Sequence, residues 1–72
     1  MTKSIYQEEY KEITKKLKKA RIETGLTQGE VSKILKKPQS YISKIETGDQ
    51  RIDIVELKLF AKIYNKTLNY FI

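Results

Sequence analysis

The sequence predicts an all-α protein, a compact bundle of five helices joined by short loops. Helix start and stop signals recur along the chain, and apolar residues follow each start at helical spacing. No stretch alternates apolar and polar residues in period two between turn signals, as a half-buried strand would. A length of 72 residues leaves room for one core, so we expect a single domain over residues 1–72.

The first helix is predicted from about Ser4 to Thr24. Ser4 and Gln7 have the spacing of a capping box, and Gly25 ends the helix because glycine adopts the left-handed conformation without penalty. Spacings of four, three, four and three residues set one apolar face for the core, made of Tyr6, Tyr10, Ile13, Leu17 and Ala20.

Two short helices follow, predicted at about 27–35 and 38–47. Thr27 and Glu30 form a second capping box at the start of the first one. Pro38 interrupts the chain but suits the first position of a new helix, and Gly48 ends that helix.

A fourth helix is predicted to begin at Asp53 and run to Tyr64, with Asn65 as its C-cap. Thr67 then caps a final turn over residues 68–71. On the fourth helix, one apolar face for the core is expected to contain Ile54, Leu57, Phe60, Ala61 and Tyr64.

The helix at 38–47 has an unusual polar face. Its apolar residues Tyr41, Ile42 and Ile45 point one way, and the opposite face contains no acid: it holds Gln39, Ser40, Ser43, Lys44 and Thr47. Small hydroxyl residues are poor helix formers, but they permit close approach to another surface. Glutamine suits the edge of adenine, lysine that of guanine, and serine either. Two short helices with such a second helix make a helix-turn-helix, whose second helix enters the major groove.

Composition narrows the function classes further. Fifteen basic against nine acidic residues give a net charge of +6, which favours a polyanionic partner. The chain contains neither cysteine nor histidine, so the usual zinc sites, disulfides and the commonest acid–base catalyst are excluded. We expect no catalysis, no cofactor and no metal. No signal peptide or membrane-spanning run is found, and a cytoplasmic protein, at the nucleoid when bound to DNA, is expected.

These residues resemble the phage-repressor and Cro-like helix-turn-helix family, also called the xenobiotic-response-element type. The resemblance extends from Ile13 to Phe71, and its motifs are Gly25-Leu26-Thr27-Gln28, the run Gln39 to Gly48, Arg51-Ile52-Asp53 and Asn65-Lys66-Thr67-Leu68. It implies a lambda-repressor-like DNA-binding domain of five helices that binds double-stranded DNA as a symmetric dimer. No small-molecule ligand domain is expected after it.

The resemblance also implies roles for individual residues. Base reading falls to Gln39, Ser40 and Lys44, with Ser43 on the same face. Phosphate contacts are expected from Gln28, which also steadies the base-reading residue, and from Lys36, Lys37, Thr47, Gly48 and Arg51. Arg21 and Glu46 match a pair that forms a partly buried ion pair; the alternative is two solvated charges.

Two positions depart from the family pattern. Lys36 stands where the turn usually holds glycine, and a left-handed lysine costs on the order of 1–2 kcal/mol; alternatively the turn differs. Pro38 stands where serine or threonine usually caps the next helix. Because proline has no side-chain hydroxyl, we expect no phosphate contact from this position, and the entry angle of the recognition helix is left open.

A second apolar stripe on the fourth helix predicts a homodimer. One helix cannot bury two faces in its own small core, and apolar surface patches mark interaction sites. The residues expected at the interface are Val55, Leu59, Ile63, Tyr70 and Ile72. The alternatives are scattered surface residues or a site for a different protein.

The sequence therefore predicts a sequence-specific, DNA-binding transcriptional regulator, a repressor or controller protein acting as a homodimer on a palindromic or pseudopalindromic operator. The alternatives are an antitoxin that represses its own operon and binds a partner protein, or an interaction module that has lost DNA binding. A membrane-surface role would need a basic helix with an exposed apolar face, whereas the first helix directs its apolar stripe to the core.

Overall fold

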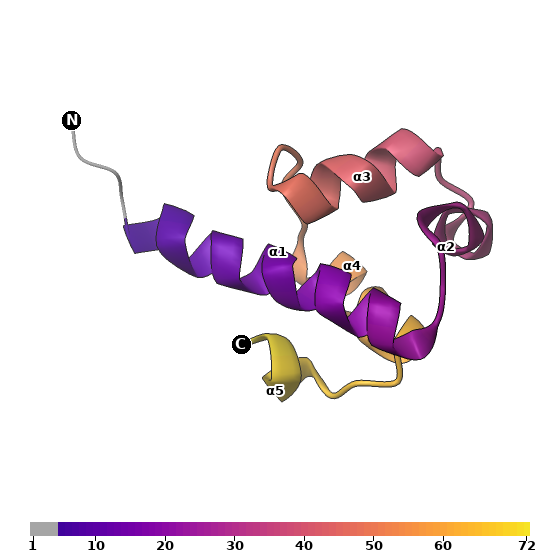
Figure 1. Ribbon diagram of the computed structural model, residues 1–72. Coiled ribbons are helices and arrows are strands. Elements are labelled where there is room, and N and C mark those ends of the chain that lie inside the picture. Colours follow the sequence, from indigo (N-terminus) through magenta and orange to yellow (C-terminus); the bar gives the residue numbers. More distant parts are fainter. Residues whose placement is uncertain (1–4) are drawn as a thin grey trace.

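The computed structural model describes the backbone of residues 5–72 and the side chains of residues 8–72. It contains five helices: α1 (Ile5–Thr24), α2 (Gln28–Leu35), α3 (Gln39–Thr47), α4 (Ile54–Ile63) and α5 (Leu68–Phe71). In Figure 1, α1 crosses the front of the bundle, with α3 above it, α5 below it and α4 behind; α2 lies beside the end of α1. The described residues contain no strand, and the all-α, five-helix prediction is confirmed.

The core lies where α1, α3 and α4 meet. Every helix contributes to a cluster made of Leu17, Ala20, Val31, Ile42, Ile45, Leu57, Phe60, Ala61, Tyr64 and Phe71. Because α2 and α5 are too short to persist alone in water, their single buried residues, Val31 and Phe71, hold them to the bundle. The Ser4–Gln7 capping box and the side chain of Tyr6 lie outside the described residues.

Capping boxes start two of the helices. In α2, the Thr27 hydroxyl accepts from the Glu30 amide at 3.1 Å, and Glu30 Oε1 accepts from the Thr27 amide at 2.8 Å. In α4, Asp53 and Glu56 make the same reciprocal pair at 2.8 and 3.1 Å. Each box satisfies two of the amides that a helix start leaves without partners.

The turn between α2 and α3 keeps the left-handed conformation although glycine is missing. Lys36 has φ 59° and ψ 43°, and the Lys37 amide donates to the Ser32 carbonyl at 3.0 Å, as in a Schellman motif. The sequence left two possibilities open, a strained left-handed Lys36 or a different turn. The structure has the strained Lys36. Pro38 is the N-cap of α3, with ψ 152°, and makes no side-chain cap; the helix begins at Gln39, one residue later than predicted.

Four local predictions need correction. Ile54 is 56% exposed, because it starts α4 and projects beyond the core. The C-cap of α4 is Tyr64, and Asn65 follows it in the left-handed conformation. Thr67 is the N-cap of α5, but its side chain makes no capping hydrogen bond. Ile63 and Tyr70, which were expected in an exposed apolar stripe, are half-buried against the core.

Candidate nucleic-acid interface

The outward face of α3 carries the polar residues that the sequence singled out. Gln39, Ser40, Lys44 and Thr47 are exposed, and Ser43 is half-buried. On the opposite face Ile42 and Ile45 are fully buried, because α3 packs on α1 and α2. The core therefore fixes the rotation of α3 about its axis and turns this face to solvent.

An ion pair ties the end of α3 to α1. The guanidinium of Arg21 donates to both carboxylate oxygens of Glu46, from Nε at 2.7 Å and from Nη2 at 3.2 Å. Its Nη1 donates to the Leu26 carbonyl at 2.8 Å. The two side chains are 12% and 4% exposed, so the pair is largely buried. The hydrogen bonds to Glu46 raise the pKa of Arg21 above its already high ordinary value.

Two glutamines continue this network to the exposed face. Gln28 Nε2 donates to Glu46 Oε1 at 3.0 Å, which orients the amide of Gln28. Gln39 Nε2 lies 3.5 Å from Gln28 Oε1, at the outer limit of a hydrogen bond. The sequence expected Gln28 to steady a base-reading residue, and the structure brings the two side chains together. A chain of polar contacts thus leads from a buried pair to the start of α3.

The residues expected at phosphates lie at both ends of α3. Lys36 and Lys37 are exposed in the preceding turn, and Arg51 is exposed in the loop that follows. Lys37 Nζ lies 5.1 Å from the centroid of the Tyr41 ring. At the other end Gly48 has φ 87°, a conformation that favours glycine.

One feature of this loop opposes anion binding. The Thr47 hydroxyl lies within hydrogen-bond distance of both the Lys44 carbonyl and Asp49 Oδ2, each at 3.1 Å. A phosphate at Thr47 would meet the Asp49 carboxylate, so this contact requires Asp49 to turn away. Thr47 is therefore an unfavourable phosphate contact, and the Gly48 amide is another, because it already donates to the Ile45 carbonyl at 3.2 Å.

Sequence reasoning missed two tyrosines that hold the loop between α3 and α4. The Tyr10 hydroxyl donates to the Gln50 carbonyl, and the Tyr41 hydroxyl donates to Glu56 Oε2. Burial and then the bond to Glu56 raise the pKa of Tyr41 far above its ordinary value. No sequence pattern could have paired them, because 40 residues separate Tyr10 from Gln50 and 15 separate Tyr41 from Glu56.

The residues expected at a dimer interface fall into two groups. Val55, Leu59 and Ile72 are 62%, 44% and 68% exposed. Ile63 and Tyr70 pack partly on the core. Ile54, which was expected inside, adds exposed apolar surface at the start of α4. The apolar surface of α4 is thus centred on residues 54–59, nearer the helix start than predicted.

Within residues 8–72, no group of three histidine, cysteine, aspartate or glutamate side chains could hold a metal ion. Among the described helices, none is long and apolar enough to cross a membrane.

Comparison with known proteins identifies this architecture. A family model described as helix-turn-helix matches residues 17–71, which is more than half of the chain and includes all of α2 to α5. No match is found among curated proteins or among solved structures.

Proposed function

This chain belongs to the Cro-like, xenobiotic-response-element type of helix-turn-helix family. We propose that it is a repressor or controller protein, which binds a palindromic or pseudopalindromic operator as a homodimer. The family is one of DNA-binding regulators and is generally non-enzymatic. The observation that carries the proposal is the outward face of α3, an acid-free surface linked through Gln28 to a buried ion pair. In this proposal the protein is cytoplasmic and is associated with the nucleoid when it is bound to its operator.

In this proposal α3 lies in the major groove and reads bases with Gln39, Ser40 and Lys44, and with Ser43 where the groove is closest. The amide of Gln28, oriented by Glu46, lies 3.5 Å from that of Gln39, and a glutamine in this position suits a bidentate contact with adenine. Lys44 stands one turn further along, next to the following base pairs. An acid on this face would repel phosphate, and none is present.

Phosphate contacts on either side would fix α3 in the groove. Lys36 and Lys37 precede it, and Arg51 follows it, together with Gln28. Thr47 and the Gly48 amide are less favourable, since the Gly48 amide donates to the Ile45 carbonyl at 3.2 Å. Contacts of this kind position a protein without reading sequence. If a dimer engages about six phosphates, the logarithm of the binding constant falls against the logarithm of the salt concentration with a slope near −5.

The dimer would form through the exposed apolar surface of α4 with Ile72. Three exposed apolar residues, Ile54, Val55 and Leu59, lie within six positions of one helix, and apolar residues gathered in this way can mark an interaction site. Two-fold symmetry then requires recognition helices about 34 Å apart, one turn of DNA.

Selection of bound sequences from a random pool of duplexes tests the proposal. We expect enrichment of one site with inverted repeats, centred about one turn apart. Enrichment of an unsymmetrical site would contradict the dimer but keep the DNA-binding role. Failure to enrich any sequence, together with no affinity for duplex DNA at low salt, would overturn the proposal.

The same apolar surface of α4 supports a second candidate, an antitoxin that represses its own operon and holds a partner protein there. This candidate predicts a chain that stays monomeric at about 100 μM alone and with operator DNA. Sedimentation therefore separates the two.

A further inference from the structure

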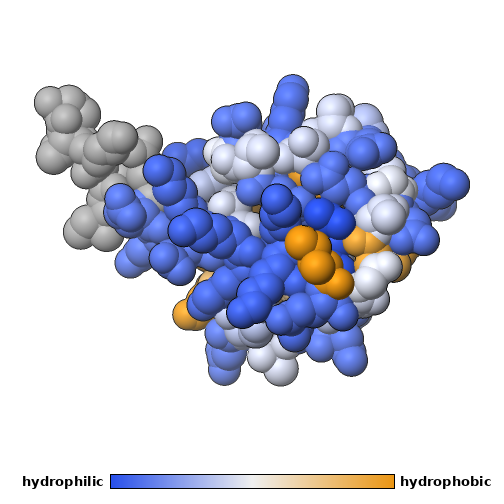
Figure 2. Space-filling model, in the orientation of Figure 1, coloured by the Kyte–Doolittle hydropathy of each residue, from blue (hydrophilic) through white to orange (hydrophobic). Residues whose placement is uncertain are grey.

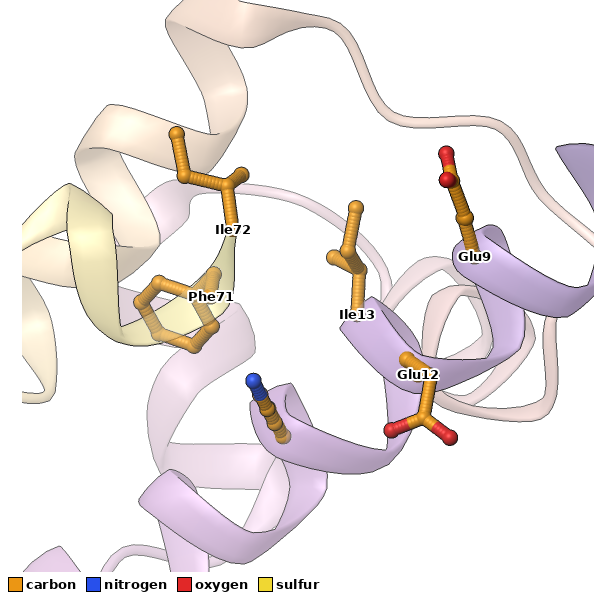
Figure 3. Close-up of a pocket in the computed structure, with 6 residues that line it drawn as sticks. Glu9, Glu12, Ile13, Phe71 and Ile72 are labelled. Atoms are coloured by element: carbon orange, nitrogen blue, oxygen red, sulfur yellow. The ribbon is translucent and has the colours of Figure 1, made fainter.

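The charges of α1 are unevenly distributed around the helix. Glu9 and Glu12 face α5 and line a pocket of about 380 Å³ that also contains Lys16; Figure 3 shows both acids with Phe71 and Ile72. Further along, Glu23 pairs with Lys66 at 3.0 Å, in the connection that leads to α5. Three of the acids of α1 thus lie on the side that the C-terminal part of the chain occupies.

The other flank is basic. Arg21 marks the side of α1 that contacts α3, and a rotation of 100° per residue puts Lys11 and Lys18 next to that side, away from the core. Both lysines are exposed, and among the described residues the ion pairs are those of Arg21 with Glu46 and of Lys66 with Glu23. Figure 2 shows a front face, crossed by α1, that is mainly hydrophilic. Neither lysine forms an ion pair within residues 8–72, although Glu8 lies one helical turn before Lys11.

Tyr10 places this flank beside the loop that follows α3. Its hydroxyl donates to the Gln50 carbonyl, so the turn of α1 that contains Tyr10 and Lys11 lies against the residue before Arg51. Burial raises the pKa of Tyr10; the nearby positive charge of Arg51 opposes that rise, and the negative charge of Glu56 adds to it. The basic flank of α1 is therefore continuous with a residue expected at a phosphate.

We propose that Lys11 and Lys18 form a second phosphate-binding strip, the α1 strip, which contacts the DNA backbone beyond the phosphates reached from the ends of α3. This inference rests on the proposed function. The two residues are two helical turns apart, about 10.5 Å along the axis, and a DNA strand carries one phosphate per about 3.4 Å of its axis. The two lysines can therefore reach different phosphates of one strand.

The two ends of the strip differ in their relation to the family match. The match begins at residue 17, so Lys18 lies within it, whereas Tyr10 and Lys11 lie outside it. In Figure 1 the N-terminal half of α1 extends past the end of α3. The strip adds affinity for DNA of any sequence, since phosphates carry no sequence information. Tyr10 is a positioning residue, which sets the start of the strip against the loop.

Salt titrations of duplex binding by the full chain test the strip, with Lys11→Gln and Lys18→Gln compared with Lys19→Gln. Lys19 is exposed on the same helix but points away from both α3 and the core, so it is a control of equal charge. Each strip variant should bind about 3- to 10-fold more weakly, to the selected site and to an unrelated duplex alike. The salt slope should be shallower by about 1 for each phosphate that the variant no longer neutralises. The control should stay within about twofold of the wild type.

Tyr10→Phe tests the positioning role. It should weaken binding severalfold in the wild type and have little further effect in a Lys11→Gln background, whereas a purely structural role would weaken binding equally in both. Melting curves would show that each variant is folded.

Binding by both strip variants that equals that of Lys19→Gln would overturn the strip. In that case Arg51→Ala would still weaken binding, and the proposed function would stand. A wild-type chain without affinity for duplex DNA would overturn both.

Discussion

The recognition side of the molecule, which consists of α2 and α3, and the outer face of α4 begin with the same local capping signals. They differ in the contacts that hold their side chains in place. Helices α2 and α4 both start with a capping box. On the recognition side, Gln39 leads back through Gln28 to the buried Arg21–Glu46 pair. On α4, Val55 and Leu59 stand exposed.

This difference matches the two kinds of ligand proposed. Base edges are read by hydrogen bonds, whose strength depends on angle and distance, so their donors must be oriented before binding. An apolar interface gains free energy from the area removed from water, which is not directional. A polar network would add nothing to the α4 face, whereas the α3 face depends on one.

The largest effect should come from breaking the network at its buried end. Glu46→Ala leaves the Arg21 charge buried with only the Leu26 carbonyl as partner, and removing one member of a buried pair can cost about 3–5 kcal/mol. We expect a loss of about 2–4 kcal/mol in thermal melting, since Arg21 is partly exposed. A double-mutant cycle with Arg21→Ala should give strong coupling; coupling near zero would contradict the role of the pair.

The matching change on α4 is Leu59→Glu. A charge in an apolar interface would lose its water without gaining a partner, so the dimer should weaken at least 100-fold, which is about 2.7 kcal/mol. Monomer stability should change little, because Leu59 is already 44% exposed. Sedimentation near 100 μM measures the difference, with Lys58→Glu as a control that places the same side chain on the same helix. A wild type that is monomeric with and without operator would refute the dimer.

Substitutions on α3 and in its loop should separate base reading from phosphate contact. Gln39→Ala and Lys44→Ala should each cost about 1–3 kcal/mol on the selected site and relax specificity there. Arg51→Ala should weaken binding to every duplex alike. Binding constants on the selected and scrambled sites test this. Uniform weakening by all three variants would mean that α3 does not read bases.

A gain of stability is expected in the turn before α3. Lys36 has φ 59°, and Lys36→Gly should stabilise the fold by about 1 kcal/mol, since glycine has no left-handed penalty. Asn65→Gly is the matched control: Asn65 has φ 57°, but asparagine tolerates this region better, so its gain should be smaller. Equal gains in thermal melting would show that side-chain strain is not the cause.

The smallest effect at neutral pH should come from Tyr64→Phe. The Tyr64 hydroxyl is buried and has no hydrogen-bond partner among the described residues, so removing it should stabilise the fold by up to about 1 kcal/mol. Tyr41→Phe, which removes a bond to Glu56, should instead destabilise it.

High pH should increase the cost of the Tyr64 hydroxyl. Burial raises its pKa well above the ordinary value near 10. Ionisation of Tyr64 therefore leaves stability unchanged below pH 10 and lowers it as pH rises toward the folded-state pKa, because the unfolded chain ionises first. Chemical unfolding of the wild type should show a steep loss of stability above about pH 10, and Tyr64→Phe should lose less. Identical alkaline profiles would contradict the burial of this hydroxyl.

The sequence by itself determined the number of helices and most of their ends. The signals involved are local: a cap and its partner three residues on, such as Thr27 with Glu30, or a glycine such as Gly48 after the last turn. Helical spacing also identified Leu17, Ala20, Ile42 and Ile45 as core. Local signals failed at Ile54. Its helical spacing places it on the same face as the core residues of α4, but it is the first residue of the helix and lies beyond the core.

Only the tertiary structure decided how separate helices meet. The contacts of Tyr10 with Gln50 and of Tyr41 with Glu56 join residues far apart in the chain, and no periodicity specifies such partners. The same holds for the conformation of Lys36, where the hydrogen bonds that close α2 outweigh a left-handed penalty of about 1–2 kcal/mol. Helical phase depends on neighbours within a few residues, whereas packing selects among all surfaces that the helices offer. The periodicity of the sequence could therefore identify which face of α3 is polar, whereas Gln28 and Glu46 could be placed behind that face only through the family resemblance or the tertiary structure.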